Sequence, residues 1–191
     1  MAMQVPLPRC GEITEIVGRV SSGRTSLCLR WLAEITGRGG VAALVDTDHT
    51  FDPVSAERVG IDLGRLLWVR CRSRRETALR ATDALVRCPG FALVVLDTGE
   101  VPPRLASTAA FRLKLAVRRS DIALVILTRR RLSGAAATVA IETVQAGLEW
   151  SGRCPRRLDG LRISVHRLRP QAARHPAAAD TAWPVFWRWS A

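Results

Sequence analysis

The chain has 191 residues, of which 48% are hydrophobic and 24% charged, a balance that suits one folded core and excludes global disorder. No apolar run approaches the ~18 residues of a membrane span, and the opening MAMQVPLPRC lacks the layout of a signal peptide, so we expect a cytoplasmic protein. The formal net charge of +12 favours an anionic partner such as nucleic acid, with codon bias toward arginine as the alternative, since Lys114 is the only lysine.

A phosphate-binding loop is the first motif along the chain. The apolar, β-branched stretch 13–17 predicts a strand, and the periodicity of 25–36 predicts a helix. Residues 18–25 between them match G-x-x-x-x-G-K-[ST], except that Arg24 stands at the lysine position. Such a loop turns its backbone N–H groups around a phosphate, the lysine neutralises charge, and the hydroxyl after it binds magnesium. The fork of an arginine changes that chemistry, because a guanidinium is not a point charge.

Strands and helices then alternate. The patterns predict helices at 52–59, 75–87 and 104–118 and buried strands at 41–45, 66–69, 91–97 and 122–127. This alternation predicts an α/β fold with a doubly wound, mostly parallel sheet. The segments 144–150 and 161–168 alternate apolar and polar residues and predict an antiparallel pair added at the C-terminal edge of the sheet.

The cysteines and histidines indicate no metal centre of their own. They are dispersed, the cysteines are odd in number and never spaced as C-x-x-C, and we interpret them as reduced thiols. The only metal that we expect is a magnesium ion accompanying a bound nucleotide.

Ligands of such sheets lie at the carboxyl ends of the strands, where the loop 18–25, Asp48 and Asp97 should converge. We expect Thr25 and Asp97 to bind magnesium, and Asp48 is a weak candidate for the catalytic residue that orients a water molecule. The alternative for Asp97 is a carboxylate that caps the following turn.

The order of these features resembles the ATPase core of the RecA recombinase family, and more closely its shortened relatives of the ImuA type, associated with bacterial translesion synthesis. The resemblance runs from Gly11 to about Leu168, and its most specific part is the segment from Asp46 to Pro53, with Asp-His-x-x-Asp-Pro at its end. It implies a RecA-like P-loop fold, ATP and magnesium as possible cofactors, and partnership with a polymerase-like protein of the ImuB type and with RecA itself.

Four positions depart from the family pattern that the resemblance implies. The family has Lys at Arg24, a water-activating Glu at Asp48, an adenine-stacking Tyr at Ser55 and a phosphate-sensing Gln at Arg129, while the adenine-contacting acid is retained as Asp52. Shortening a catalytic side chain by about 1 Å can cost ~10²-fold in rate, so the changes together predict no ATPase activity or very little. The residues expected to bind nucleotide are Gly18, Ser21, Ser22, Gly23, Arg24, Thr25, Asp52, Asp97 and Arg129.

Two further surfaces are candidate binding sites. The arginines 118, 119, 130 and 131 could contact DNA, with a solvated basic surface as the alternative. From Pro170 the chain is rich in Ala and Pro, and we divide it into a core at 1–170 and a tail at 171–191. The tail's aromatic residues are either a partner-binding anchor or pack on the domain itself; they are Trp183, Phe186, Trp187 and Trp189.

The sequence thus predicts an accessory or adaptor protein of DNA damage tolerance with a degenerate nucleotide site. Two alternatives stay open: a weak DNA-stimulated ATPase, and a nucleic-acid-binding module that depends on arginine charge.

Overall fold

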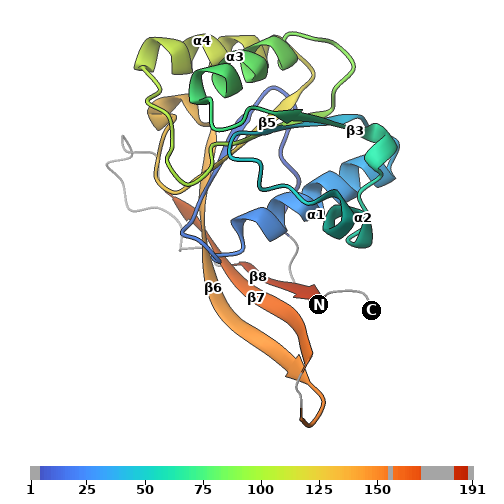
Figure 1. Ribbon diagram of the computed structural model, residues 1–191. Helices are drawn as coiled ribbons and strands as arrows, with labels where there is room; N and C mark the ends of the chain where they lie inside the picture. The colour runs from blue at the N-terminus through green and yellow to red at the C-terminus, as the bar shows by residue number, and fades with distance from the viewer. Residues whose placement is uncertain (1–4, 155–156, 169–182, 189–191) are drawn as a thin grey trace.

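We describe a computed structural model of the chain, covering residues 5–154 and 157–168 and, for the backbone alone, 183–188. Helices cover both faces of one twisted sheet, with α1 (Arg24–Gly37) and α2 (Pro53–Arg58) on one side and α3 (Arg75–Leu85) and α4 (Ser107–Arg118) on the other (Figure 1). None of the helices in the described ranges is long and apolar enough to cross a membrane.

Within the described residues, the sheet contains eight strands in the order β3-β2-β4-β5-β1-β6-β7-β8. The first six in that order run parallel, and β7 and β8 are antiparallel to their neighbours. The predicted fold class is therefore confirmed. The strands are β1 (Ile13–Val17), β2 (Ala42–Asp46), β3 (Leu66–Arg70), β4 (Leu93–Asp97), β5 (Ala123–Thr128), β6 (Val139–Ser151), β7 (Arg157–Leu168) and β8 (Trp183–Arg188). Short 3-10 turns lie at Leu63–Arg65 and Gly134–Ala136.

The central strands are buried on both faces, so their apolar residues alternate between two cores. Ile16, Val95 and Leu127 pack with α1 on one side, and Val45 and Leu124 pack with α3 and α4 on the other. This double burial explains why these strands appear in the sequence as continuous apolar runs.

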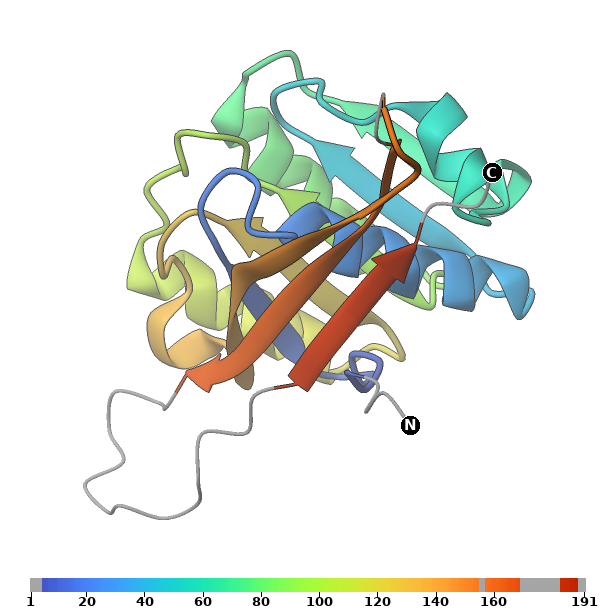
Figure 2. The same ribbon diagram turned by 90° about the horizontal axis from the view of Figure 1, so that it is seen from below.

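The long strand β6 differs from its prediction. The alternation of apolar and polar residues predicted a strand from residue 144, but the strand begins at Val139. Its residues 139–142 pair in parallel with β1. Its outer half forms the predicted antiparallel pair with β7, with register shifts after Gln145 and Glu149. Seen from below, β6, β7 and β8 cross over α1 (Figure 2), and Leu161, Ile163 and Val165 of β7 belong to the same core as that helix.

Residues 183–188, which we assigned to the tail, form β8 and pair antiparallel with residues 160–165 of β7. The side chains of Trp183, Phe186 and Trp187, and the whole of Trp189, lie outside the described residues.

Candidate functional site

The predicted phosphate-binding loop lies between β1 and α1, as its motif requires. Gly23, the residue before the helix, has φ +88, and α1 begins at Arg24 without a side chain capping its first turn. A Cβ at Gly23 would lie 2.2 Å from Cδ1 of Ile163, so β7 packs directly against the loop. Ser22 is bound to the neighbouring strand by a hydrogen bond of 2.9 Å between its hydroxyl and that of Thr143 on β6.

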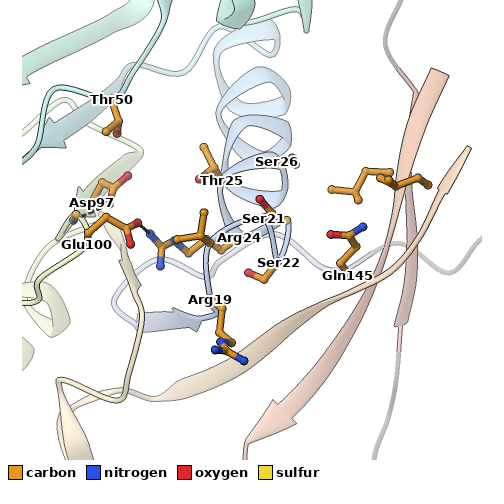
Figure 3. A pocket seen from close by; sticks show the side chains of 15 residues that line it. Arg19, Ser21, Ser22, Arg24, Thr25, Ser26, Thr50, Asp97, Glu100 and Gln145 are labelled. Carbon is orange, nitrogen blue, oxygen red and sulfur yellow. Dashed lines mark hydrogen bonds and ion pairs between the residues drawn. The ribbon is translucent and has the colours of Figure 1, made fainter. Parts of the chain in front are cut away.

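A cavity of about 460 Å³ opens beside this loop. On one side it is bounded by Asp97, Gly99 and Glu100, and on the other by Gln145, Leu148 and Leu161 of the β6–β7 pair. Figure 3 shows the labelled Gln145 and the Asp97–Glu100 segment on opposite sides of the loop. Residues 19–26 and Thr50 complete the lining.

Arg24 is buried, and both terminal nitrogens of its guanidinium bind other groups of the protein. Its Nη1 donates to the backbone oxygen of Gly18 at 2.7 Å, and its Nη2 lies 3.0 Å from Oε1 of Glu100. The other carboxylate oxygen of Glu100 lies 3.0 Å from Nη1 of Arg129. Glu100 therefore bridges the two arginines that stand at the lysine and phosphate-sensing positions. Figure 3 shows its contact with Arg24.

Asp48 holds the segment that carries Glu100. Its Oδ2 accepts a hydrogen bond of 3.0 Å from the backbone N–H of Glu100, and its Oδ1 lies 3.8 Å from Nη2 of Arg75. The nitrogen Nε of Arg75 in turn donates to the backbone oxygen of Val101. The candidate catalytic residue is thus engaged in fixing the loop after β4, and it is not part of the cavity lining.

The two expected magnesium ligands, Thr25 and Asp97, do line the same cavity. Asp97 is at the end of β4, in register with Asp46 at the end of β2, and its Oδ1 accepts the N–H of Gly99. Burial raises the pKa of the Asp97 carboxyl, and Asp46 and Asp48 add to this effect, while the Gly99 N–H and Arg24 oppose it.

The phosphates of a nucleotide do not fit this arrangement as it stands. The positive charges that would receive them already hold the Glu100 carboxylate, and Arg24 would have to turn away from Gly18 to reach a ligand. We therefore derive no step of hydrolysis from the site.

Asp52 lies outside the cavity lining. It caps the N-terminus of α2, where its carboxylate accepts the N–H groups of Val54 and Ser55. The hydroxyl of Ser55 also donates to it, and this hydrogen bond is the largest cause of its lowered pKa.

The four candidate DNA-binding arginines do not form one surface. Arg118 ends α4 and Arg119 follows it, toward the amino end of β5, while Arg130 and Arg131 follow the carboxyl end of β5. Arg131 is also engaged internally, because its Nε lies 3.1 Å from the carboxylate of Glu15, which is fully buried on β1. That carboxylate also accepts the N–H groups of Leu132 and Ser133 and the Ser133 hydroxyl, so the loop after β5 is fixed to the sheet.

The sequence did not predict that Glu100, or side chains of the β6–β7 pair, would line the cavity. In the sequence, Glu100 is notable only as an acidic residue three positions after Asp97. Its role follows only from the structure, in which Arg24 and Arg129 both pair with it. Gln145, Leu148 and Leu161 have no signal of their own, because the curl of β6 and β7 over α1 brings them to the loop.

Comparison with known proteins identifies the family. The model of the RecA N-terminal domain matches residues 2–109, more than half of the chain. The chain belongs to the RecA N-terminal domain family. Its match covers the loop 18–25, the Asp46–Pro53 segment and the strand that ends at Asp97.

Several RecA proteins are similar to this RecA-family chain. Protein RecA of Methylobacterium radiotolerans is 34% identical over 184 residues, covering 87% of this chain and 50% of its own length. Protein RecA of Methylococcus capsulatus is 38% identical over 144 residues, covering 66% of this chain and 41% of its own. That of Chlorobaculum tepidum is 45% identical over 92 residues, covering 48% and 26%. The chain thus spans about half the length of the curated relatives it matches, or less.

Proposed function

We propose that this chain is a RecA-like accessory or adaptor protein of DNA damage tolerance, of the ImuA type, in translesion synthesis and SOS-type mutagenesis. In this proposal it acts through contacts with a polymerase-like partner of the ImuB type, with RecA or with DNA, and turns over ATP slowly or not at all. Its RecA-family membership and its degenerate site support this function.

One observation carries the proposal: the carboxylate of Glu100 occupies the charges on which a nucleotide would depend. An internal carboxylate bound to Arg24 and Arg129 competes with phosphate for the same donors, at an effective concentration that a free ligand cannot easily match. A family fold with this arrangement keeps its surfaces while its nucleotide affinity falls.

Substitution of Glu100 tests this competition. The change Glu100→Gln removes the charge that holds both arginines, so the variant should gain affinity for magnesium–ATP. If its Kd reaches about 10 μM, 1 mM ATP adds about 2.7 kcal/mol to its stability, a rise of roughly 5–11 °C in Tm for a domain of this size. The original chain should show no such rise when measured the same way.

Glu149→Gln is the matched control, because Glu149 also pairs with an arginine, at 3.1 Å, but lies outside the cavity lining. It should leave the response to ATP unchanged. A strong response to ATP by the unaltered chain would contradict internal competition.

A weak DNA-stimulated ATPase remains the second candidate, because Thr25 and Asp97 still line one cavity. Phosphate release measured with and without single-stranded DNA separates the two. If the unaltered chain hydrolyses ATP and the change Asp97→Ala abolishes that activity, the chain is an ATPase and the adaptor-only proposal is wrong.

We assign partner binding to the aromatic residues at 183–189. Because 183–188 form a strand of the sheet, alanine substitutions at Trp183 and Trp187 test the assignment better than a deletion would. A pull-down with an ImuB-type partner should lose binding in these variants, and unchanged binding by correctly folded variants would refute it.

A further inference from the structure

The loop between β3 and α3 carries a dense group of arginines at the same edge of the sheet as the nucleotide site. Residues 70–75 contain four of them, and those at 70, 72 and 74 are exposed. Among the described residues, none of these three guanidinium groups has an ion-pair or hydrogen-bond partner. Arg75 differs, since it is bound to Val101 and lies near Asp48. The loop therefore presents three uncompensated positive charges to solvent.

The backbone of this loop is fixed. The N–H of Cys71 donates to the oxygen of Asp46 at 2.9 Å, and that of Ser73 donates to the oxygen of Thr47 at 2.6 Å. Arg72 and Ser73 have φ of 49 and 61, in the left-handed region that residues other than glycine rarely adopt. Two such residues in succession persist only where surrounding contacts hold them, so the arginines project from a pre-organised backbone.

An aromatic stack lies beside Arg70, where the same loop begins. The rings of His49 and Trp68 are parallel within 8°, with centroids 5.3 Å apart, and Phe51 packs edge-on against Trp68. The indole N–H of Trp68 donates to Oδ2 of Asp46, and the guanidinium of Arg70 lies 4.9 Å from the Trp68 ring. His49 is exposed, and among the described residues Trp68 is the one aromatic ring that stacks on it.

We propose that loop 70–75 and His49 form a binding site for single-stranded nucleic acid. Arg72 and Arg74 pair with backbone phosphates, whose oxygens match the planar fork of a guanidinium, and an unpaired base stacks on the exposed ring of His49. An acidic peptide would use the same arginines but would leave that flat ring face unused, so the combination favours a nucleic acid. The stack requires an exposed base, which favours a single strand over a duplex.

This site differs in position from the arginines at 118–119 and 130–131, and no part of it belongs to the cavity beside the phosphate-binding loop. The inference therefore does not depend on whether ATP binds, or on the polymerase-like partner. Binding assays without nucleotide test it alone.

The experiment measures fluorescence anisotropy of a labelled oligo-dT 20-mer with the full chain over a range of salt concentrations. The double variant Arg72→Gln/Arg74→Gln should bind about 10- to 100-fold more weakly at 50 mM salt, and its slope of log K against log salt should be shallower by about 1.4, the value for two phosphate contacts on a single strand. His49→Ala should bind several-fold more weakly with the slope unchanged, because stacking releases no counterions.

The matched control is Arg38→Gln/Arg65→Gln, which removes the same charge at the amino ends of the strands, from two exposed arginines outside every candidate site. It should stay within about 3-fold of the unaltered chain, and circular dichroism should establish that every variant is folded. If both double variants lost the same affinity for oligo-dT, binding would depend on overall charge and the proposed site would be wrong. Absence of oligo-dT binding by the unaltered chain at 50 mM salt would also overturn the proposal. Competition by polyglutamate as effective as that by unlabelled oligo-dT would replace nucleic acid with an acidic protein as the ligand.

Discussion

Arg24 illustrates how one substitution alters a binding site at the residue scale. A lysine ammonium is a compact charge, whereas the guanidinium of Arg24 can donate to Gly18 and meet Glu100 at once. The sequence predicted that the chemistry of this position is changed, and it predicted Thr25 and Asp97 in the lining of the same cavity. It could not predict that Glu100 pairs with Arg24, because side-chain pairing over a separation of 76 residues depends on the path of the chain.

Asp97 should make stability depend on pH in a direction opposite to that of most carboxylates. Its pKa is raised in the folded protein, so the folded state binds more protons than the unfolded state between the two pKa values. The stability associated with this group is full below the unfolded pKa, about 3.9, and is lost as pH rises through the folded value. We expect Asp97→Asn, whose side-chain oxygen can keep the Gly99 hydrogen bond, to be more stable than the original chain at pH 7, with an advantage that shrinks toward pH 4.

Asp83 provides a control of opposite sign. The hydrogen bond from Arg87 lowers its pKa, so Asp83→Asn should be less stable than the original chain at neutral pH, and this deficit should also shrink on acidification. Urea unfolding of both variants at pH 4 and pH 7 measures the differences. A loss of stability in Asp97→Asn at pH 7 would contradict the desolvation of Asp97.

At the scale of elements, β7 forms a wall of the phosphate-binding loop. Gly23 is required both by its backbone conformation and by Ile163, which is fully buried against it. The motif alone accounts for the first requirement, since a loop of this type needs a glycine here. Nothing local predicts the second, because Ile163 follows Gly23 by 140 residues and approaches it only through the bending of β6 and β7 over α1.

Gly23→Ala should therefore destabilise the chain by about 2–4 kcal/mol, from left-handed strain plus overpacking against Ile163. Gly39→Ala is the matched control: Gly39 has the same φ of +88, but a Cβ there meets nothing within 4 Å, so its cost should be about 1 kcal/mol. Denaturant unfolding measures both.

The pairing is checked by adding Ile163→Ala to Gly23→Ala. Removing the clashing side chain should make the double variant more stable than the sum of the single costs predicts, by at least about 1 kcal/mol. Strict additivity would contradict direct contact between β7 and the loop.

At the scale of the whole molecule, β8 covers the outer edge of β7 and is itself the last strand of the sheet. Without it, β7 would present unpaired backbone groups along residues 160–165, and such edges template association with other chains. A chain ending at residue 168 should therefore self-associate, as measured by size-exclusion chromatography with light scattering. A chain ending at residue 188 keeps β8 and should behave like the full chain; a monodisperse monomer of the shorter chain would contradict the role of β8.

The sequence by itself determined the order of strands and helices, the place of the phosphate-binding loop and the carboxylates at the strand ends. These follow from local periodicity and from short motifs, which act over a few residues. Only the tertiary structure decided that Glu100 lies between Arg24 and Arg129, that β7 packs against Gly23, and that His49 stacks on Trp68 beside Arg70. These contacts join residues from separate elements, and their geometry depends on how the whole sheet twists and curls, which no local pattern encodes.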